Sequence, residues 1–147
     1  MRRRDWLVLF CGLLIAGCRR RPDPITAELS VWKSRTCGCC ALWVDHMRVN
    51  GFNVRVTDVD DVTEFRVKAG VPDSLRSCHT ATIDGYAVEG HIPADVVRNL
   101  LAQRPPVRGI AVPGMPIGSP GMEGARKERY NVLAFDEMGA TSVFATR

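Results

Sequence analysis

The chain lacks an apolar run long enough to cross a membrane, although its amino-terminal segment is apolar. The run at residues 6–16 is shorter than the about 20 residues that a membrane-spanning helix needs. Three arginines, at positions 2–4, precede this run, and positive charge followed by a short apolar segment is typical of a secretory signal. We therefore predict that residues 1–17 are a signal peptide.

The chain also lacks a large excess of charge of one sign. Its net charge is +4 at pH 7, and residues 1–17 hold three arginines and one aspartate, so their removal lowers that value by two. Proteins that bind nucleic acid through phosphates need a dense surface of lysine and arginine. We therefore expect no nucleic-acid partner.

The end of the apolar segment carries a second targeting signal. Residues 14–18, Leu-Ile-Ala-Gly-Cys, resemble the bacterial lipoprotein box, in which Cys18 becomes the lipidated first residue after cleavage. A plain anchor and an ordinary secretory signal are the alternatives. Position 19 is Arg19 and not the aspartate that usually retains such lipoproteins at the inner membrane. The signal therefore leaves both the inner and the outer membrane as destinations of the protein. Residues 19–27 contain proline among charges and predict a tether.

Four of the six cysteines lie beyond the targeting segment. Of six cysteines, Cys11 leaves with a cleaved signal and Cys18 carries lipid, so four thiols remain: Cys37, Cys39, Cys40 and Cys78. The remaining chain is long enough to form one hydrophobic core without disulfide staples. In an oxidising periplasm, thiols pair or bind metal. Both considerations favour a functional role for these four cysteines.

Hydrophobic periodicity predicts an α/β domain at residues 28–147. The expected elements are a strand at 29–32, a helix at 39–50 capped by Thr36, a strand at 52–59, a helix at 62–69, strands at 80–83 and 86–89, a helix at 93–103, and a final hairpin of strands 130–135 and 141–145. Proline and glycine at residues 112–122 exclude a helix or a central strand there. The order predicts a βαβαββα core with a C-terminal Pro/Gly loop and a β-hairpin extension.

This core resembles the thioredoxin and glutaredoxin fold. That fold carries a C-x-x-C motif where the first strand enters the first helix, and Cys37 and Cys40 occupy those places. It also carries a cis-proline in the loop before the third strand. Alignment on residues 83–85, Ile-Asp-Gly, places His79 at the position of that proline. Cys78 and His79 therefore offer two further ligands opposite the C-x-x-C.

The residue types in these two segments predict a metal site. A helix amino terminus favours the thiolate form of a nearby cysteine. Thiolates with imidazole suit Cu(I) or Zn(II), and thioethers add a preference for Cu(I). The predicted ligands are Cys37, Cys39, Cys40, Cys78 and His79, with His91, Met115 and Met122 as further candidates. The alternatives are a Cys37–Cys40 disulfide with Cys39 as filler, a hydrogen-bonded loop histidine, and methionines that only pack.

Four segments together resemble one family of small bacterial periplasmic metal-binding proteins, the CopG-type family, formerly described only as a domain of unknown function. These segments are residues 32–40, 77–80, 88–93 and 112–123. The resemblance extends from about Leu29 to the last residue. It implies a thioredoxin-like fold and a cysteine-rich copper site, and it leaves open a multinuclear cluster with redox activity.

The resulting expectation is a lipid-anchored periplasmic protein that binds copper, as Cu(I) or Cu(II), in copper tolerance or handling. Its expected partners are copper ions, other periplasmic copper-handling proteins and, through the anchor, a membrane. One alternative is a thiol-disulfide oxidoreductase with Cys37 as nucleophile and Cys40 as resolving thiol. The other is a structural zinc domain.

Overall fold

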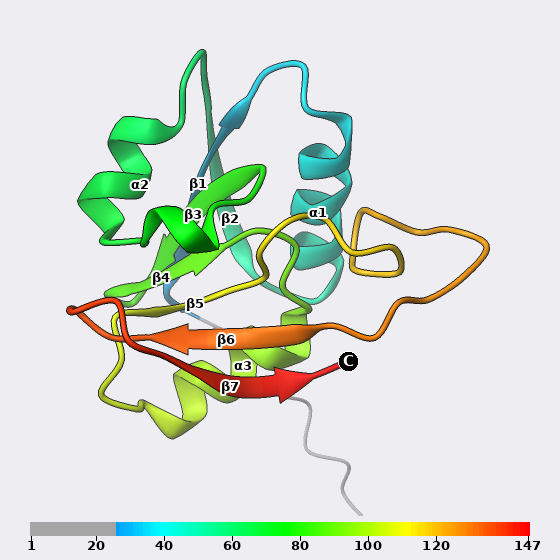
Figure 1. The fold of residues 1–147 in the computed structure, drawn as a ribbon. Coiled ribbons are helices and arrows are strands. Elements are labelled where there is room, and N and C mark those ends of the chain that lie inside the picture. The colour runs from blue at the N-terminus through cyan, green and yellow to red at the C-terminus, as the bar shows by residue number, and fades with distance from the viewer. Residues whose placement is uncertain (1–25) are drawn as a thin grey trace, which may run out of the picture.

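The computed structural model describes residues 26–147. The predicted signal peptide, most of the tether and the predicted lipidation site Cys18 lie outside these described residues. The elements in chain order are β1 (Glu28–Ser34), α1 (Gly38–Val49), β2 (Asn53–Val59), α2 (Thr63–Ala69), a 3-10 turn (Asp73–Leu75), β3 (His79–Ile83), β4 (Tyr86–Glu89), α3 (Ala94–Gln103), β5 (Gly109–Ala111), β6 (Asn131–Phe135) and β7 (Thr141–Thr146) (Figure 1). Between residues 26 and 147, no helix is both long and apolar enough to cross a membrane.

All seven strands form one sheet in the order β2-β1-β3-β4-β5-β6-β7. Strands β1 and β2 are parallel, whereas β3 runs antiparallel to β1 and β4 antiparallel to β3. These four strands and the three helices make the predicted thioredoxin-like βαβαββα core. The predicted hairpin of β6 and β7 extends the sheet beyond it.

Strand β5 was not expected. It pairs in parallel with β4 and antiparallel with β6, and so joins the terminal hairpin to the core. Its three residues are fewer than the four to eight over which alternation can be recognised in a sequence. The pairing of its backbone with two neighbours, rather than a local pattern, defines it as a strand.

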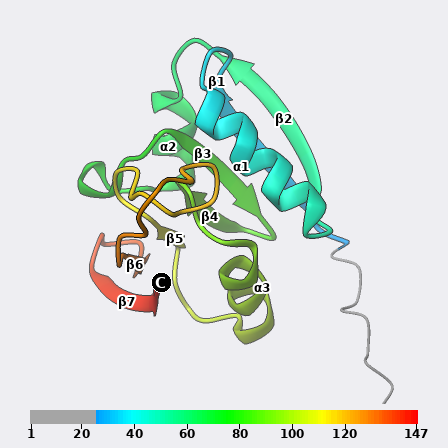
Figure 2. The same cartoon turned by 90° about the vertical axis from the view of Figure 1, so that its right-hand side faces the viewer.

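Helices cover both faces of the core sheet, with α1 and α3 on one side and α2 on the other (Figures 1 and 2). Successive residues of β4 show the division. Val88 belongs to the larger apolar cluster, together with Trp43 of α1, whereas Ala87 belongs to a smaller cluster with Ala69 and Phe135. Because both faces are covered, all four residues of β4 are buried.

The turns follow the glycine signals of the sequence. In the hairpin between β3 and β4, Asp84 and Gly85 have φ values of 49° and 86°, as expected for a type I′ turn. Gly70 ends α2 in the left-handed conformation. The expectation that Thr36 caps α1 is wrong: the N-cap residue is Cys37, without a side-chain cap, and the Thr36 hydroxyl contacts that of Ser34 at 3.2 Å instead.

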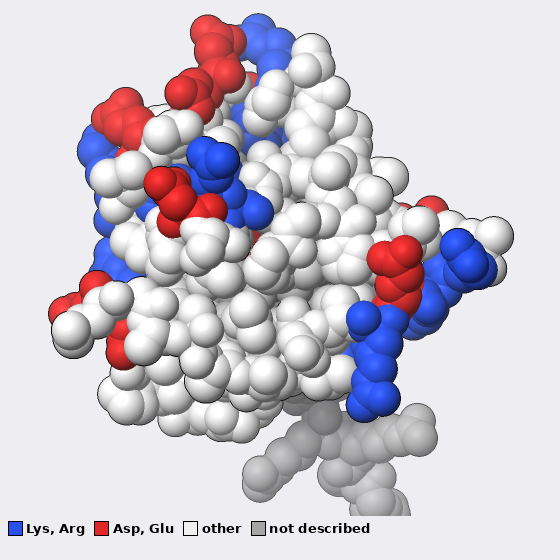
Figure 3. Space-filling view, in the orientation of Figure 1, with Lys and Arg blue, Asp and Glu red and all other residues white. Residues whose placement is uncertain are grey.

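The charged side chains of the described residues are of mixed sign on the face seen in Figure 3. Lysine and arginine lie interspersed with aspartate and glutamate towards its margins, and a broad central area carries neither. A continuous basic stripe is therefore absent from this face of residues 26–147.

Candidate metal centre

Four cysteine sulfurs from two distant segments converge at one end of the sheet. Cys37, Cys39 and Cys40 lie at the amino end of α1, and Cys78 immediately precedes β3. Their Sγ atoms all lie within 4.8 Å of one another. The Cys39 Sγ is 3.5 Å from the Cys37 Sγ and 4.0 Å from the Cys78 Sγ. The expected meeting of the CxCC segment with the Cys78 segment is therefore present in the fold.

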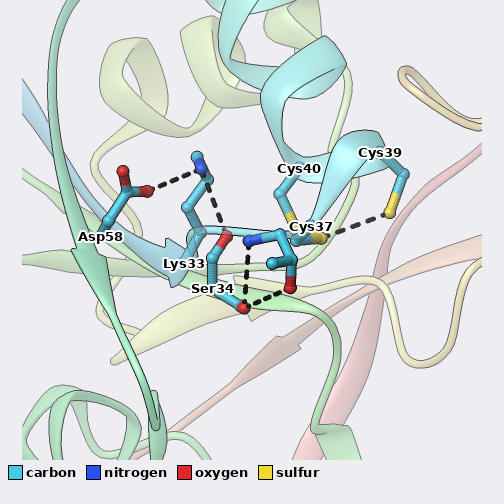
Figure 4. A network of polar contacts seen from close by, with 7 residues as sticks. Lys33, Ser34, Cys37, Cys39, Cys40 and Asp58 are labelled. Carbon is cyan, nitrogen blue, oxygen red and sulfur yellow. Dashed lines mark hydrogen bonds and ion pairs between the residues drawn. A yellow bond between two sulfur atoms is a disulfide. The ribbon is translucent and has the colours of Figure 1, made fainter.

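The pairing of β1 with β3 brings the two segments together. Lys33, near the end of β1, lies opposite His79, at the start of β3. The buried Lys33 ammonium donates hydrogen bonds to the Asp58 carboxylate of β2 at 2.7 Å and to the Ser34 carbonyl at 3.3 Å. The Cys37 amide donates to the same Ser34 carbonyl at 3.1 Å. These bonds hold the turn that leads into the CxCC motif, and Figure 4 draws the two that Lys33 donates.

Cys37 and Cys40 are joined by a disulfide, which is the pairing that the sequence left as an alternative. Cys40 is completely buried, whereas Cys37 remains partly exposed. Cys39 and Cys78 are free thiols in the described part of the chain. Metal binding by all four sulfurs therefore requires reduction of this disulfide.

The protonation of Cys78 depends on its surroundings. Burial, and next the neighbouring Cys39, raise the pKa of the Cys78 thiol to about 12. The metal-free site therefore holds a neutral thiol at pH 7. A bound cation inverts this preference because it stabilises the thiolate.

Two histidines that follow Cys78 in the chain, His79 and His91, are buried. His79 is fully buried, with its ring centroid 4.2 Å from the Trp43 ring and 5.2 Å from the His91 ring. Both ring nitrogens of His79, and Nε2 of His91, have no hydrogen-bond partner within residues 26–147. Burial, and next the neighbouring His91, lower the pKa of His79 to about 3. His79 is therefore a neutral imidazole with an unused lone pair.

Neither histidine belongs to the four-sulfur group, which is the only group of three or more potential ligand atoms found in the described residues. A buried polar atom without a partner is costly and needs an explanation. A soft metal ion would satisfy an imidazole nitrogen as well as the thiolates. The orphaned nitrogens therefore fit a metal site that extends from the sulfurs towards the histidines.

The Pro/Gly loop packs against the first turn of α1. The His91 Nδ1–H donates to the Pro120 carbonyl at 2.7 Å, which leaves the Nε2 lone pair free. A Cβ atom on Gly121, where φ is +84°, would lie 2.5 Å from the Cys39 carbonyl oxygen and 3.0 Å from the Trp43 amide nitrogen. Only glycine allows this approach without a shift of the backbone.

The two candidate methionines occupy different parts of this loop. Met115 is half exposed and lines, with Cys78, an open cavity of about 470 Å³. Met122 directly follows Gly121 and is partly buried. A larger cavity of about 620 Å³ opens beside His46 and Asp95, but no cysteine lines it. We therefore associate the smaller cavity with the sulfur site.

Glu89 and Arg66 were not among the predicted site residues, but their buried side chains both bond to Ser77, next to Cys78. The Arg66 Nε lies 2.9 Å from the Glu89 Oε1. Burial raises the pKa of the Glu89 carboxyl, and hydrogen bonds from Thr80 and Ser77 oppose this shift. The available signal was a carboxylate at the end of an otherwise apolar strand, because a buried charge usually has a partner.

Comparisons with known proteins agree with this geometry. A family model described as a protein of unknown function, DUF411, matches residues 75–122, a range that contains Cys78 and both buried histidines. Comparison with curated proteins found no match. Two solved structures of copper resistance protein CopG, Form 2 and Form 1, are 43% identical and cover 82% of this chain. They are covered over 98% and 96% of their own lengths, with TM-scores of 0.78 and 0.77. The chain belongs to the family of copper resistance protein CopG.

Proposed function

We propose that this protein binds copper in copper tolerance or handling. In the reduced state the ligands are Cys37, Cys39, Cys40, Cys78 and His79, and His91, Met115 and Met122 are further candidates. The observation that carries the proposal is the convergence of four sulfurs from two chain segments within 4.8 Å. Thiolates are soft ligands that suit Cu(I).

We place this activity outside the cytoplasm, in a periplasmic domain formed by residues 28–147. The lipoprotein-like segment ending at Cys18 supports an anchor in one of the two membranes, with residues 19–27 as the tether. The Cys37–Cys40 disulfide suits an oxidising compartment. Copper ions and other periplasmic copper-handling proteins are the partners that this location offers.

The number of potential ligands exceeds what one Cu(I) ion needs. Four thiolates and two imidazoles support either a multinuclear cluster or a site where ligands exchange during transfer. The Cys37/Cys40 pair also supplies a redox couple. Its oxidation to the disulfide releases two electrons and two protons, which balances the reduction of two Cu(II) ions to Cu(I).

A metal competition experiment tests the assignment. The protein is reduced without metal and titrated with Cu(I) and with Zn(II) at buffered free concentrations. We expect Cu(I) to displace Zn(II), and copper-edge X-ray absorption to show sulfur neighbours. Displacement of Cu(I) by Zn(II) at comparable free concentrations would instead support a structural zinc site.

The second candidate function is thiol-disulfide exchange, which the disulfide at the redox position of the fold favours. In that reaction the Cys37 thiolate attacks a substrate disulfide, one substrate thiolate leaves, and Cys40 then displaces the other to close the Cys37–Cys40 bond. Cys39→Ser separates the two functions, because Cys39 lies outside this pair. We expect Cys39→Ser to weaken copper binding. Unchanged copper affinity and stoichiometry, with disulfide reductase activity in the parent, would favour exchange.

A further inference from the structure

The carboxylate of Glu89 lies fully buried at the end of β4 and accepts three hydrogen bonds. Its Oε1 accepts from the Arg66 Nε at 2.9 Å and from the Ser77 backbone amide at 2.8 Å. Its Oε2 accepts from the Thr80 hydroxyl at 2.7 Å. One side chain thus contacts the chain on both sides of residues 78 and 79.

Hydrogen bonds to three backbone carbonyls also hold this segment. The Arg66 guanidinium also donates to the Ser77 carbonyl at 2.9 Å, and the Gly90 amide donates to the His79 carbonyl at 3.1 Å. The Ser77 hydroxyl donates to the Gly114 carbonyl at 2.6 Å, which ties the Pro/Gly loop to the same corner. The segment that carries Cys78 is therefore held from α2, from β4 and from the loop.

No cis-proline shapes the segment that carries Cys78. Residues 26–147 contain no cis peptide bond, and His79 stands where the resemblance to thioredoxin places a cis-proline. A loop without such a constraint is free to sample other conformations, and small displacements of a ligand group reduce function strongly. The hydrogen bonds of Glu89, together with those of Arg66 and Ser77, constrain the segment instead.

We propose that Glu89, held by Arg66, is a positioning residue that fixes Cys78 and His79 for metal binding. It orients the Cys78 thiol towards Cys39 and keeps the His79 ring against Trp43. This inference rests on the proposed copper function, but its structural part is testable without metal. Metal ligands are held in place by such outer contacts, whose loss typically lowers metal affinity about 10- to 100-fold.

The first test is a double-mutant cycle on Cu(I) affinity. Glu89→Gln replaces one acceptor oxygen by a donor and keeps the shape. It should weaken Cu(I) binding about 10-fold in the parent and have a smaller effect in a Cys78→Ser background, where only His79 is left to position. A residue that only stabilised the fold would lower the affinity equally in both backgrounds, and that result would overturn the proposal.

Two threonines provide a milder variant and its control. Thr80→Val removes only the hydroxyl that donates to Glu89, and should weaken Cu(I) binding in the same direction. Thr82→Val makes the same change two residues along the same face of β3, where no side-chain hydrogen bond is present among the described residues. It should leave the affinity unchanged. Equal effects of the two variants would contradict the role of Glu89. Thr80→Val retains the ion pair between Arg66 and Glu89. The proposal can therefore still be tested with Thr80→Val if Glu89→Gln fails to fold.

The second test uses metal-free protein and is independent of copper. In a Cys37→Ser, Cys40→Ser background, treatment with the thiol oxidant diamide should link Cys39 to Cys78, as detected by peptide mapping. We expect Glu89→Gln to slow this linkage on the order of tenfold and Thr82→Val to leave it unchanged. A parental rate in Glu89→Gln would disprove the positioning role even if copper binds. If Glu89→Gln slows the linkage but the parent protein does not prefer Cu(I), the positioning role of Glu89 is supported and the copper function is rejected.

Discussion

The Sγ atoms of Cys39 and Cys78 lie 4.0 Å apart although 39 residues separate them in the chain. Cys39 also lies 3.5 Å from the sulfur of Cys37. Cys39 therefore lies between the C-x-x-C pair and Cys78. The copper proposal depends on this proximity of the two segments.

Removal of the Cys78 thiol should weaken copper binding strongly. In Cys78→Ser, loss of an inner ligand should exceed the about 10- to 100-fold effect typical of an outer group. His79→Ala should act in the same direction, more weakly if the imidazole only orients another ligand. Cu(I) affinity and copper-edge X-ray absorption measure both variants. Affinity and spectrum unaltered in both would make this segment structural.

The Cys78 thiol should react slowly in the folded, disulfide-containing, metal-free protein. Its pKa is raised to about 12, and only the thiolate is nucleophilic. Its alkylation by iodoacetamide should therefore rise about tenfold per pH unit from pH 7 to 10. In unfolded protein the rate should level off near the ordinary pKa of 9.0. A plateau near pH 9 in the folded protein would show that burial does not protect the thiol.

Acid should destabilise the metal-free protein through His79. Burial lowers its pKa from 6.5 to about 3, so between these values the unfolded chain takes up a proton that the folded chain does not. The stability that depends on neutral His79 is fully present above pH 6.5 and is lost as the pH falls towards 3. Over this range the free energy of unfolding falls with a limiting slope of about 1.36 kcal/mol per pH unit. Urea unfolding at several pH values measures it. His79→Phe should reduce the slope, and an unchanged slope would assign the acid sensitivity to other groups.

The docking of the Pro/Gly loop should depend on Gly121. Gly121→Ala places a Cβ against the Cys39 carbonyl and adds the strain of a positive φ, which costs roughly 1–2 kcal/mol. Gly114→Ala is a matched control, because its φ is +71° but a Cβ there meets nothing within 4 Å. We expect Gly121→Ala to lose more stability in urea unfolding and to weaken Cu(I) binding. Equal losses in the two variants would mean that only backbone strain matters.

Most helices and strands could be predicted because their signals are local. Asp84-Gly85 produced the expected hairpin, and Gly70 ended α2 as expected. The cap of α1 was wrong because Thr36 bonds to Ser34 rather than to the helix. Strand β5 was missed because only its partners β4 and β6 make it a strand.

The sequence by itself determined the donor types: three thiols in four residues, a Cys-His pair in a second segment, and a thioredoxin-like order of elements. These properties depend on residue identity and on neighbours along the chain. The tertiary structure decided which donors meet. It placed Cys78 beside Cys39, kept both histidines outside the four-sulfur group and buried Glu89 behind the Cys78 segment. Distances, burial and shifted pKa values arise from packing between segments far apart in sequence, so local patterns do not contain them.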